Sequence, residues 1–214
     1  MGADGSSVGN RRAHCRCRAQ EVRCRLNAMD LSLVKNYVDV IDFGAAALGD
    51  RDMVVIGDDR VSWNEMQRRA GQVANALVAD GVGSQDRVAF IDKNSVEFFE
   101  VVFGAAYVNG VTVAVNWRLA APEMAYIIND SQAKVLIVHE EFAEHLAAFE
   151  ADLTHVTRIV VIGSHGSHAT YDAWRDAHDG SFQPVGSADD DVAAQLYTSG
   201  TTGLPKGAQL TNGN

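Results

Sequence analysis

The hydrophobic pattern of this chain alternates short apolar runs with longer amphipathic segments. The runs rich in Val and Ile occupy 87–91, 111–115, 134–138 and 158–162, and helical spacing is found between them over 94–110, 122–129 and 140–151. Short β-branched runs separated by helices are typical of parallel βαβ units. Right-handed crossovers would place those helices on both faces of one sheet. The pattern therefore predicts an α/β fold of layered, parallel-sheet βαβ units.

Flanking segments complete this pattern. Upstream, it predicts a helix over 33–48, a hairpin with strands at 53–56 and 60–63, and a helix from 62 to about 80. Downstream, residues 163–191 are less regular and contain a short helix at 171–178, before a last apolar strand at 192–197.

The helix that starts near residue 62 carries both a start and a stop signal. Ser62 and Glu65 have the spacing of a capping box, and Gly81 is expected to end the helix. Four apolar residues between these signals are expected on one buried face: Met66, Val73, Leu77 and Val78.

Two polar clusters in the irregular segment have more than one interpretation. His165 and His168 would suit a metal site or a solvated loop, and the lack of a carboxylate or cysteine near them in sequence favours the loop. Asp189, Asp190 and Asp191 are expected to form a solvated turn rather than a metal site.

Composition adds a strong charge asymmetry. The 214 residues are 47% hydrophobic, which is ample for a packed core, and the formal net charge is −10. Residues 1–29 hold six arginines and two acidic residues, whereas residues 30–214 hold 12 basic and 26 acidic residues. An acidic body argues against nonspecific nucleic-acid binding. No apolar stretch reaches the ~18 residues of a transmembrane helix.

The first 29 residues differ from the body. They contain all three cysteines: Cys15, Cys17 and Cys24. With His14 these could be written as a zinc site, but the spacing matches no standard finger, and the N-terminus also fits a myristoylation pattern. We interpret 1–29 as a basic, disordered extension with Met29 as the natural start, and 30–214 as the body. Because the body has no cysteine, a reducing cytoplasm fits.

A loop rich in hydroxyls and glycines follows the last apolar strand. Its sequence is Tyr197-Thr198-Ser199-Gly200-Thr201-Thr202-Gly203-Leu204-Pro205-Lys206-Gly207. Glycines let the backbone approach a ligand closely, and successive N–H groups can form an anion-binding concavity. Hydroxyls donate to phosphate oxygens, and Lys206 adds a positive charge. The loop therefore suits a polyphosphate, above all ATP.

Two other kinds of loop share parts of this composition. A Ser/Thr/Gly surface linker is one alternative. A Walker-type loop is another, but it requires Gly directly before its Lys and Ser or Thr directly after it. Here Pro205 precedes Lys206 and Gly207 follows it.

The string Y-T-S-G-T-T-G-L-P-K-G resembles the phosphate-binding signature of the AMP-forming adenylating enzymes, which include acyl-CoA synthetases, luciferases and peptide-synthetase adenylation domains. A chance match at eight fixed positions has a probability on the order of 10⁻¹⁰ per start site, so composition alone does not explain it. Similar elements occur upstream at 61–66, 86–98, 110–123 and 130–137. Asn116-x-Arg118-Leu119 is most similar to the fatty-acyl-CoA ligase branch. The resemblance covers about 33–211 and implies the first half of the family's large N-terminal domain.

This resemblance implies a ligase reaction. A carboxylic acid, above all a fatty acid, would react with ATP to give acyl-AMP and pyrophosphate, and coenzyme A would then take the acyl group. ATP, Mg²⁺ and coenzyme A are the implied cofactors and co-substrates. The residues implied to bind the phosphates are Thr198, Ser199, Gly200, Thr201, Thr202, Gly203 and Lys206. Lys206, Thr201 and Thr202 are the expected catalytic residues, and no protein metal ligand is expected.

In the family, the elements that bind adenine and ribose and that complete adenylation follow this loop. The chain alone is therefore expected to be truncated and catalytically crippled. The alternative is a non-catalytic remnant, or half of a split ligase, whose exposed sheet edge binds a complementing C-terminal half or a second copy. The chain is expected in the cytoplasm, with peripheral membrane contact left open.

Overall fold

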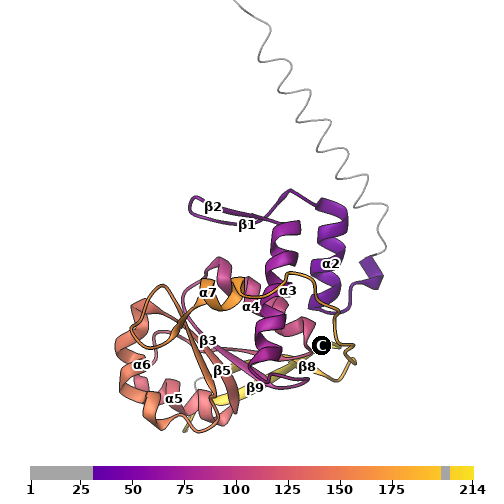
Figure 1. Ribbon diagram of the computed structural model, residues 1–214. Coiled ribbons are helices and arrows are strands. Elements are labelled where there is room, and N and C mark those ends of the chain that lie inside the picture. The colour runs from indigo at the N-terminus through magenta and orange to yellow at the C-terminus, as the bar shows by residue number, and fades with distance from the viewer. Residues whose placement is uncertain (1–30, 199–202) are drawn as a thin grey trace, which may run out of the picture.

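A computed structural model describes residues 31–198 and 203–214 (Figure 1). The extension predicted over 1–29 lies outside the described residues. So do four residues of the predicted phosphate loop: Ser199, Gly200, Thr201 and Thr202.

The described residues form one seven-stranded sheet with the strand order β7-β6-β5-β3-β4-β8-β9. The strands are β3 (Arg87–Ile91), β4 (Val111–Ala114), β5 (Ala133–His139), β6 (Arg158–Ile162), β7 (Ala169–Thr170), β8 (Val192–Thr198) and β9 (Lys206–Thr211). Every neighbouring pair is parallel except β8 and β9, which are antiparallel. The predicted α/β class with a largely parallel sheet is confirmed.

Helices cover both faces of this sheet, as the crossover rule predicts. One face carries α2 (Tyr37–Leu48), α3 (Trp63–Ala79), α4 (Val96–Tyr107) and α7 (Tyr171–Asp176), and the other carries α5 (Ala121–Asp130) and α6 (Ala143–Phe149). Alternate residues of β3 divide between the two cores. Val88 and Phe90 face the first set of helices, and Ala89 and Ile91 face the second. This alternation follows from the two-residue period of a strand.

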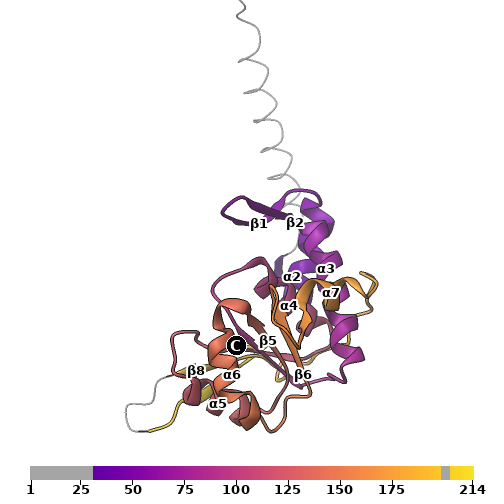
Figure 2. The same ribbon diagram turned by 60° about the vertical axis from the view of Figure 1, so that its left-hand side comes forward.

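The predicted hairpin forms a separate two-stranded sheet. β1 (Asp52–Ile56) pairs antiparallel with β2 (Asp59–Ser62). Figure 2 shows it projecting from the main body beside α2 and α3. Short 3-10 helices complete the described secondary structure: η1 (Leu31–Leu33), η2 (Glu140–Phe142) and η3 (Glu150–Asp152).

The ends of α3 confirm most of the predicted signals and correct two details. The Ser62 hydroxyl accepts from the Glu65 N–H at 3.2 Å, but the Glu65 carboxylate pairs with arginines of its own helix rather than returning to the cap. Gly81 ends the helix with φ +83°. Val78 is 51% exposed, so its predicted place on the buried face is wrong. Each residue of an α-helix is rotated by ~100° from the one before it, so the Val78 side chain points about 100° away from that of the buried Leu77.

Other helix boundaries differ from the pattern where local capping decides them. The first helix begins at Tyr37 rather than near residue 33, because Asn36 and Asp39 form a reciprocal capping box. The helix predicted over 94–110 begins after Ser95, whose hydroxyl accepts from the Phe98 N–H, and ends at Tyr107. The helix predicted over 140–151 is divided into η2, α6 and η3.

Candidate functional site

The predicted phosphate loop connects β8 to β9 at one end of the sheet. β8 lies between β4 and β9, with Thr112, Val113 and Ala114 of β4 beside Ala194, Gln195 and Leu196. Because β3, β4, β5 and β8 are parallel, their carboxyl ends meet at one edge. That edge is the usual place for ligands in open α/β sheets.

The structure brings two predicted phosphate-binding residues together at the base of this loop. Thr198, the last residue of β8, pairs in register with Lys206, the first residue of β9. Both are exposed, as is Gly203 between them in the chain. Lys206 and Gly207 belong to β9, which corrects their placement in the loop. The other predicted residues, Ser199, Gly200, Thr201 and Thr202, lie outside the described residues.

The Lys206 ammonium group is not neutralised by the part of the chain that the structure describes, where no carboxylate lies within 4.0 Å of it. Lys93, after β3 at the same edge of the sheet, differs: its Nζ contacts Glu141 at 2.6 Å and lies 5.3 Å from the Trp117 ring centre. In a protein of net charge −10, Lys206 is therefore a cation available to an anionic ligand.

The residue next to Thr198 is tied to α5. The Tyr197 hydroxyl donates to Asp130 Oδ2 at 2.5 Å and accepts from Gln195 Nε2 at 2.9 Å. Burial and the neighbouring Asp130 carboxylate raise the pKa of Tyr197 well above its ordinary value. The hydroxyl therefore remains protonated and able to donate. Sequence reasoning did not identify Asp130 as a partner, because it lies on another element.

The other end of β8 is held by residues that precede β3 and β4. Gln85 exchanges two hydrogen bonds with Val192, from the Val192 N–H to Oε1 at 3.0 Å and from Nε2 to the Val192 carbonyl at 3.2 Å. Asn109 donates to Asp191 Oδ2 at 2.9 Å. The Ala188 N–H and Asn109 lower the pKa of Asp191. Asp189 and Asp190 form the predicted exposed turn, and the half-exposed Asp191 also anchors the start of β8 through its hydrogen bonds.

Residues 42–214 match the sequence profile of a family described as AMP-binding enzyme. The chain belongs to this family.

Curated relatives of the chain are ligases for several kinds of acid. The fatty acid–[acyl-carrier-protein] ligase ScoC of Streptomyces coeruleorubidus is 37% identical over 153 residues, which make up 71% of this chain and 28% of that protein. Feruloyl-CoA synthase of an Amycolatopsis species is 38% identical over 158 residues, or 74% of this chain and 30% of the relative. The relatives confirm the family resemblance that the loop sequence carries.

Solved structures agree on the fold. The crystal structure of the anthranilate CoA ligase AuaEII in complex with anthranoyl-AMP has a TM-score of 0.80 and 28% identity, over 83% of this chain and 35% of that chain. The chain spans about 28% of the length of ScoC and 30% of the length of the feruloyl-CoA synthase.

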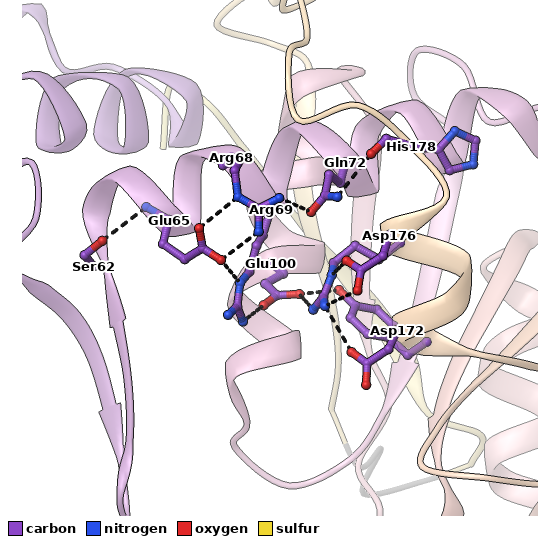
Figure 3. Close-up of polar contacts among 11 residues, drawn as sticks. Ser62, Glu65, Arg68, Arg69, Gln72, Glu100, Asp172, Asp176 and His178 are labelled. Carbon is purple, nitrogen blue, oxygen red and sulfur yellow. Dashed lines mark hydrogen bonds and ion pairs between the residues drawn. The ribbon is translucent and has the colours of Figure 1, made fainter.

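A second polar cluster of the chain lies among α3, α4 and α7 (Figure 3). The fully buried Glu100 carboxylate accepts from Arg69 at 2.9 Å, from the Tyr171 hydroxyl at 3.0 Å and from Arg175 at 2.9 Å. Burial and Glu100 raise the pKa of Tyr171 well above its ordinary value. Nearby, the hydrogen bond from Arg68 lowers the pKa of Glu65 to about 2. Both oxygens of the Glu100 carboxylate accept hydrogen bonds from side chains of the protein itself. This cluster therefore joins helices rather than binding a ligand.

The two loop histidines are closer to a carboxylate than their sequence suggests. Their rings stack with centres 5.7 Å apart, and His168 Nε2 lies 3.4 Å from Glu150 Oε2. Glu150 begins η3 and was not apparent as a partner from sequence. Among the described residues, no three His, Cys, Asp or Glu side chains are grouped to hold a metal ion. None of the described helices has the length and apolarity needed to cross a membrane.

Proposed function

We propose that this chain supplies the phosphate-binding part of an ATP-dependent, AMP-forming acid–CoA ligase. The pairing of Thr198 with Lys206 at the base of the β8–β9 loop carries the proposal. Thr198 and Lys206 are cross-strand partners at the base of a glycine-bearing loop, and no carboxylate of the described residues neutralises the Lys206 ammonium group. They lie at the edge where open α/β sheets usually bind ligands. In an acidic protein, this arrangement favours a polyphosphate that brings its own negative charge.

In the proposed reaction, an acid carboxylate attacks the α-phosphorus of ATP, a new C–O–P bond forms, and the bond to pyrophosphate breaks. Lys206 neutralises the β- and γ-phosphates, while Thr198, Ser199, Thr201 and Thr202 donate from their hydroxyls. Gly200 and Gly203 let the backbone approach the phosphates. The contribution to rate is positioning and charge stabilisation. A carboxylate is already ionised at neutral pH, so the step requires no general base.

Mg²⁺ and coenzyme A belong to this proposal as partners of the substrate and of the second step. When bound, Mg²⁺ would accompany ATP and offset the negative charge of its phosphates. In the second step the thiol of coenzyme A takes the acyl group, and AMP leaves.

The acid is proposed to be a medium-to-large organic acid, with fatty acids as the first candidates. The name of the ScoC relative supports a fatty acid, and the name of a relative from Mycobacterium tuberculosis includes medium- and long-chain fatty acids. Feruloyl-CoA synthase and hydroxybenzoate–CoA ligase make aromatic acids the second group to assay.

Equilibrium binding of MgATP and of inorganic tripolyphosphate to the 214-residue chain tests the phosphate site. Lys206→Ala should weaken both about tenfold or more, because it removes a charge-assisted contact. Lys35→Ala is the matched control, because Lys35 is also an exposed lysine, and we expect a change of less than about twofold. Equal affinity of the wild-type chain and Lys206→Ala would overturn the assignment.

ATP–pyrophosphate exchange with a panel of fatty and aromatic acids tests the chemistry. Since the chain spans less than about a third of its relatives, we expect exchange near background from the chain alone. Addition of a polypeptide carrying the remaining length of a relative should raise it. Acid-dependent exchange at ordinary enzyme rates by the chain alone would contradict the proposed incompleteness.

We also propose a second candidate function, namely that the chain binds a complementing polypeptide through β9. β9 is an edge strand, and Leu196, Leu204 and Leu210 are exposed by 42–64% around it. Unpaired edge strands with apolar side chains are ready to pair with another strand. Size-exclusion chromatography of the chain mixed with that complementing polypeptide would show a heterodimer, whereas separate elution of the two would reject this candidate.

A further inference from the structure

The residue directly before the phosphate-binding Thr198 is fixed more firmly than an exposed strand end requires. The Tyr197 hydroxyl donates to Asp130 at the carboxyl end of α5 and accepts from the buried Gln195. The bond to Asp130 joins the end of β8 to a helix on one face of the sheet, and the bond from Gln195, within β8, holds the hydroxyl in place. No backbone pairing of β8 makes that connection.

The opposite strand is shaped to receive this ring. Tyr197 pairs in register with Gly207 of β9. A Cβ atom on Gly207 would lie 3.0 Å from Tyr197 Cζ and 2.6 Å from Gln195 Nε2. Real Cβ atoms rarely approach so closely, so the ring occupies space that only glycine leaves open.

Asp130 has a second tyrosine neighbour that does not belong to the β8–β9 pair. The Tyr126 hydroxyl lies 3.4 Å from Asp130 Oδ1, within α5 itself. The two tyrosines therefore share one carboxylate, but only Tyr197 transmits the contact to β8.

Resting on the proposed function, we propose that Tyr197 is a positioning residue for phosphate binding. Its hydroxyl, held by Asp130 and Gln195, fixes the end of β8 so that Thr198 stays opposite Lys206. The backbone of Thr198 follows Tyr197 directly, so a shift of the tyrosine ring changes where the Thr198 hydroxyl and the loop begin. A small displacement of such a group weakens a site built on exact mutual placement of donors.

Tripolyphosphate affinity of the full 214-residue chain tests this role, with Tyr197→Phe as the variant and Tyr126→Phe as its matched control. Each variant removes one hydroxyl that contacts Asp130 and keeps the ring. We expect Tyr197→Phe to weaken tripolyphosphate about fivefold and Tyr126→Phe to change it less than about twofold. Asp130→Asn retains an acceptor oxygen and should preserve most of the affinity, whereas Asp130→Ala should resemble Tyr197→Phe.

Two further readouts separate positioning from general stability. In a Lys206→Ala background, Tyr197→Phe should have little additional effect, because the contact that it aligns is gone. Amide hydrogen exchange should increase over 192–211 in Tyr197→Phe and stay unchanged over 87–91 and 133–139.

Wild-type affinity in Tyr197→Phe, or equal losses in the two phenylalanine variants, would overturn the positioning role while leaving the proposed function intact. Additive losses in the double variant would likewise assign Tyr197 to stability alone. A wild-type chain that binds neither tripolyphosphate nor ATP would overturn the proposed function, and this inference with it.

Discussion

Gly207 of β9 leaves the space that the ring of its cross-strand partner Tyr197 on β8 occupies. The Tyr197 ring lies so close to its cross-strand partner Gly207 that a Cβ atom there would be 3.0 Å from Tyr197 Cζ. The glycine of the loop signature thus has a packing role that is separate from the flexibility for which glycine is usually noted.

Gly207→Ala should therefore destabilise the hairpin. The added methyl group overlaps Gln195 and the Tyr197 ring, and overpacking of this kind costs about 1–3 kcal/mol. Urea denaturation measures the change in the free energy of unfolding. Gly166→Ala is the control, because a Cβ there meets nothing within 4 Å, and it should change that free energy by less than about 0.5 kcal/mol. Equal stability of Gly207→Ala and the wild-type chain would show that the ring moves freely.

At the scale of residues, the sequence predicts the side chains that could contact a ligand better than it predicts the residues that hold those side chains in place. Thr198 and Lys206 are recognisable because hydroxyls, glycines and one lysine form a dense local pattern. Their pairing across β8 and β9 depends on the register of the two strands, which the sequence of the loop does not specify. Asp130 is 67 residues from Tyr197 in the chain, and no local pattern marks such a partner.

At the scale of elements, the buried Glu100 carboxylate joins three helices. Arg69 reaches it from α3 and Arg175 and Tyr171 from α7, while Glu100 belongs to α4. The network holds α7 against α4 and α3 (Figure 3).

Glu100→Gln should destabilise the chain strongly. Arg175, which is 8% exposed, keeps ion pairs with the exposed Asp172 and Asp176 but loses its buried counter-charge. Breaking a buried ion pair costs up to about 3–5 kcal/mol. Thermal and urea unfolding measure the loss. Glu141→Gln removes the same charge from the exposed pair with Lys93 and should cost much less, because solvent screens that pair. Similar losses in the two variants would contradict the role assigned to burial.

Element prediction succeeded where a hydrophobic period was long or a cap was explicit, as in α3 and the strands of the parallel sheet. It missed β7, which has only two residues, and it did not recognise β9. The sequence of β9, Lys206-Gly207-Ala208-Gln209-Leu210-Thr211, lacks the β-branched run that predicts a strand. Pairing with β8 imposes the extended conformation there, and tertiary contacts override local preference.

At the scale of the whole molecule, the sheet is covered on both faces but ends in the exposed strand β9. The six residues from Lys206 to Thr211 are exposed except the last, which is half-buried. An uncovered edge of this kind favours association of chains.

Leu210→Lys should reduce that association, because a charge on an edge strand opposes strand pairing. Light scattering during a concentration series would show a lower apparent mass for the variant than for the wild-type chain. Val55→Lys is the control, because Val55 is also an exposed apolar strand residue, 49% against 42% for Leu210, but lies on the separate β1–β2 hairpin. A monomeric wild-type chain at every concentration would contradict this expectation.

The anchoring of β8 has a consequence for the order of folding. Gln85 and Val192 are 107 residues apart, and the entropy lost on closing a loop increases with its length. The βαβ units that contain β3, β4 and β5 close much shorter loops and can form first. β8 has its neighbours only after β4 and α5 are in place. β8 and β9, which flank the predicted phosphate loop, should thus be the last of the described strands to form as the chain leaves the ribosome. The proposed phosphate binding would then report on completed folding of the strands that precede them.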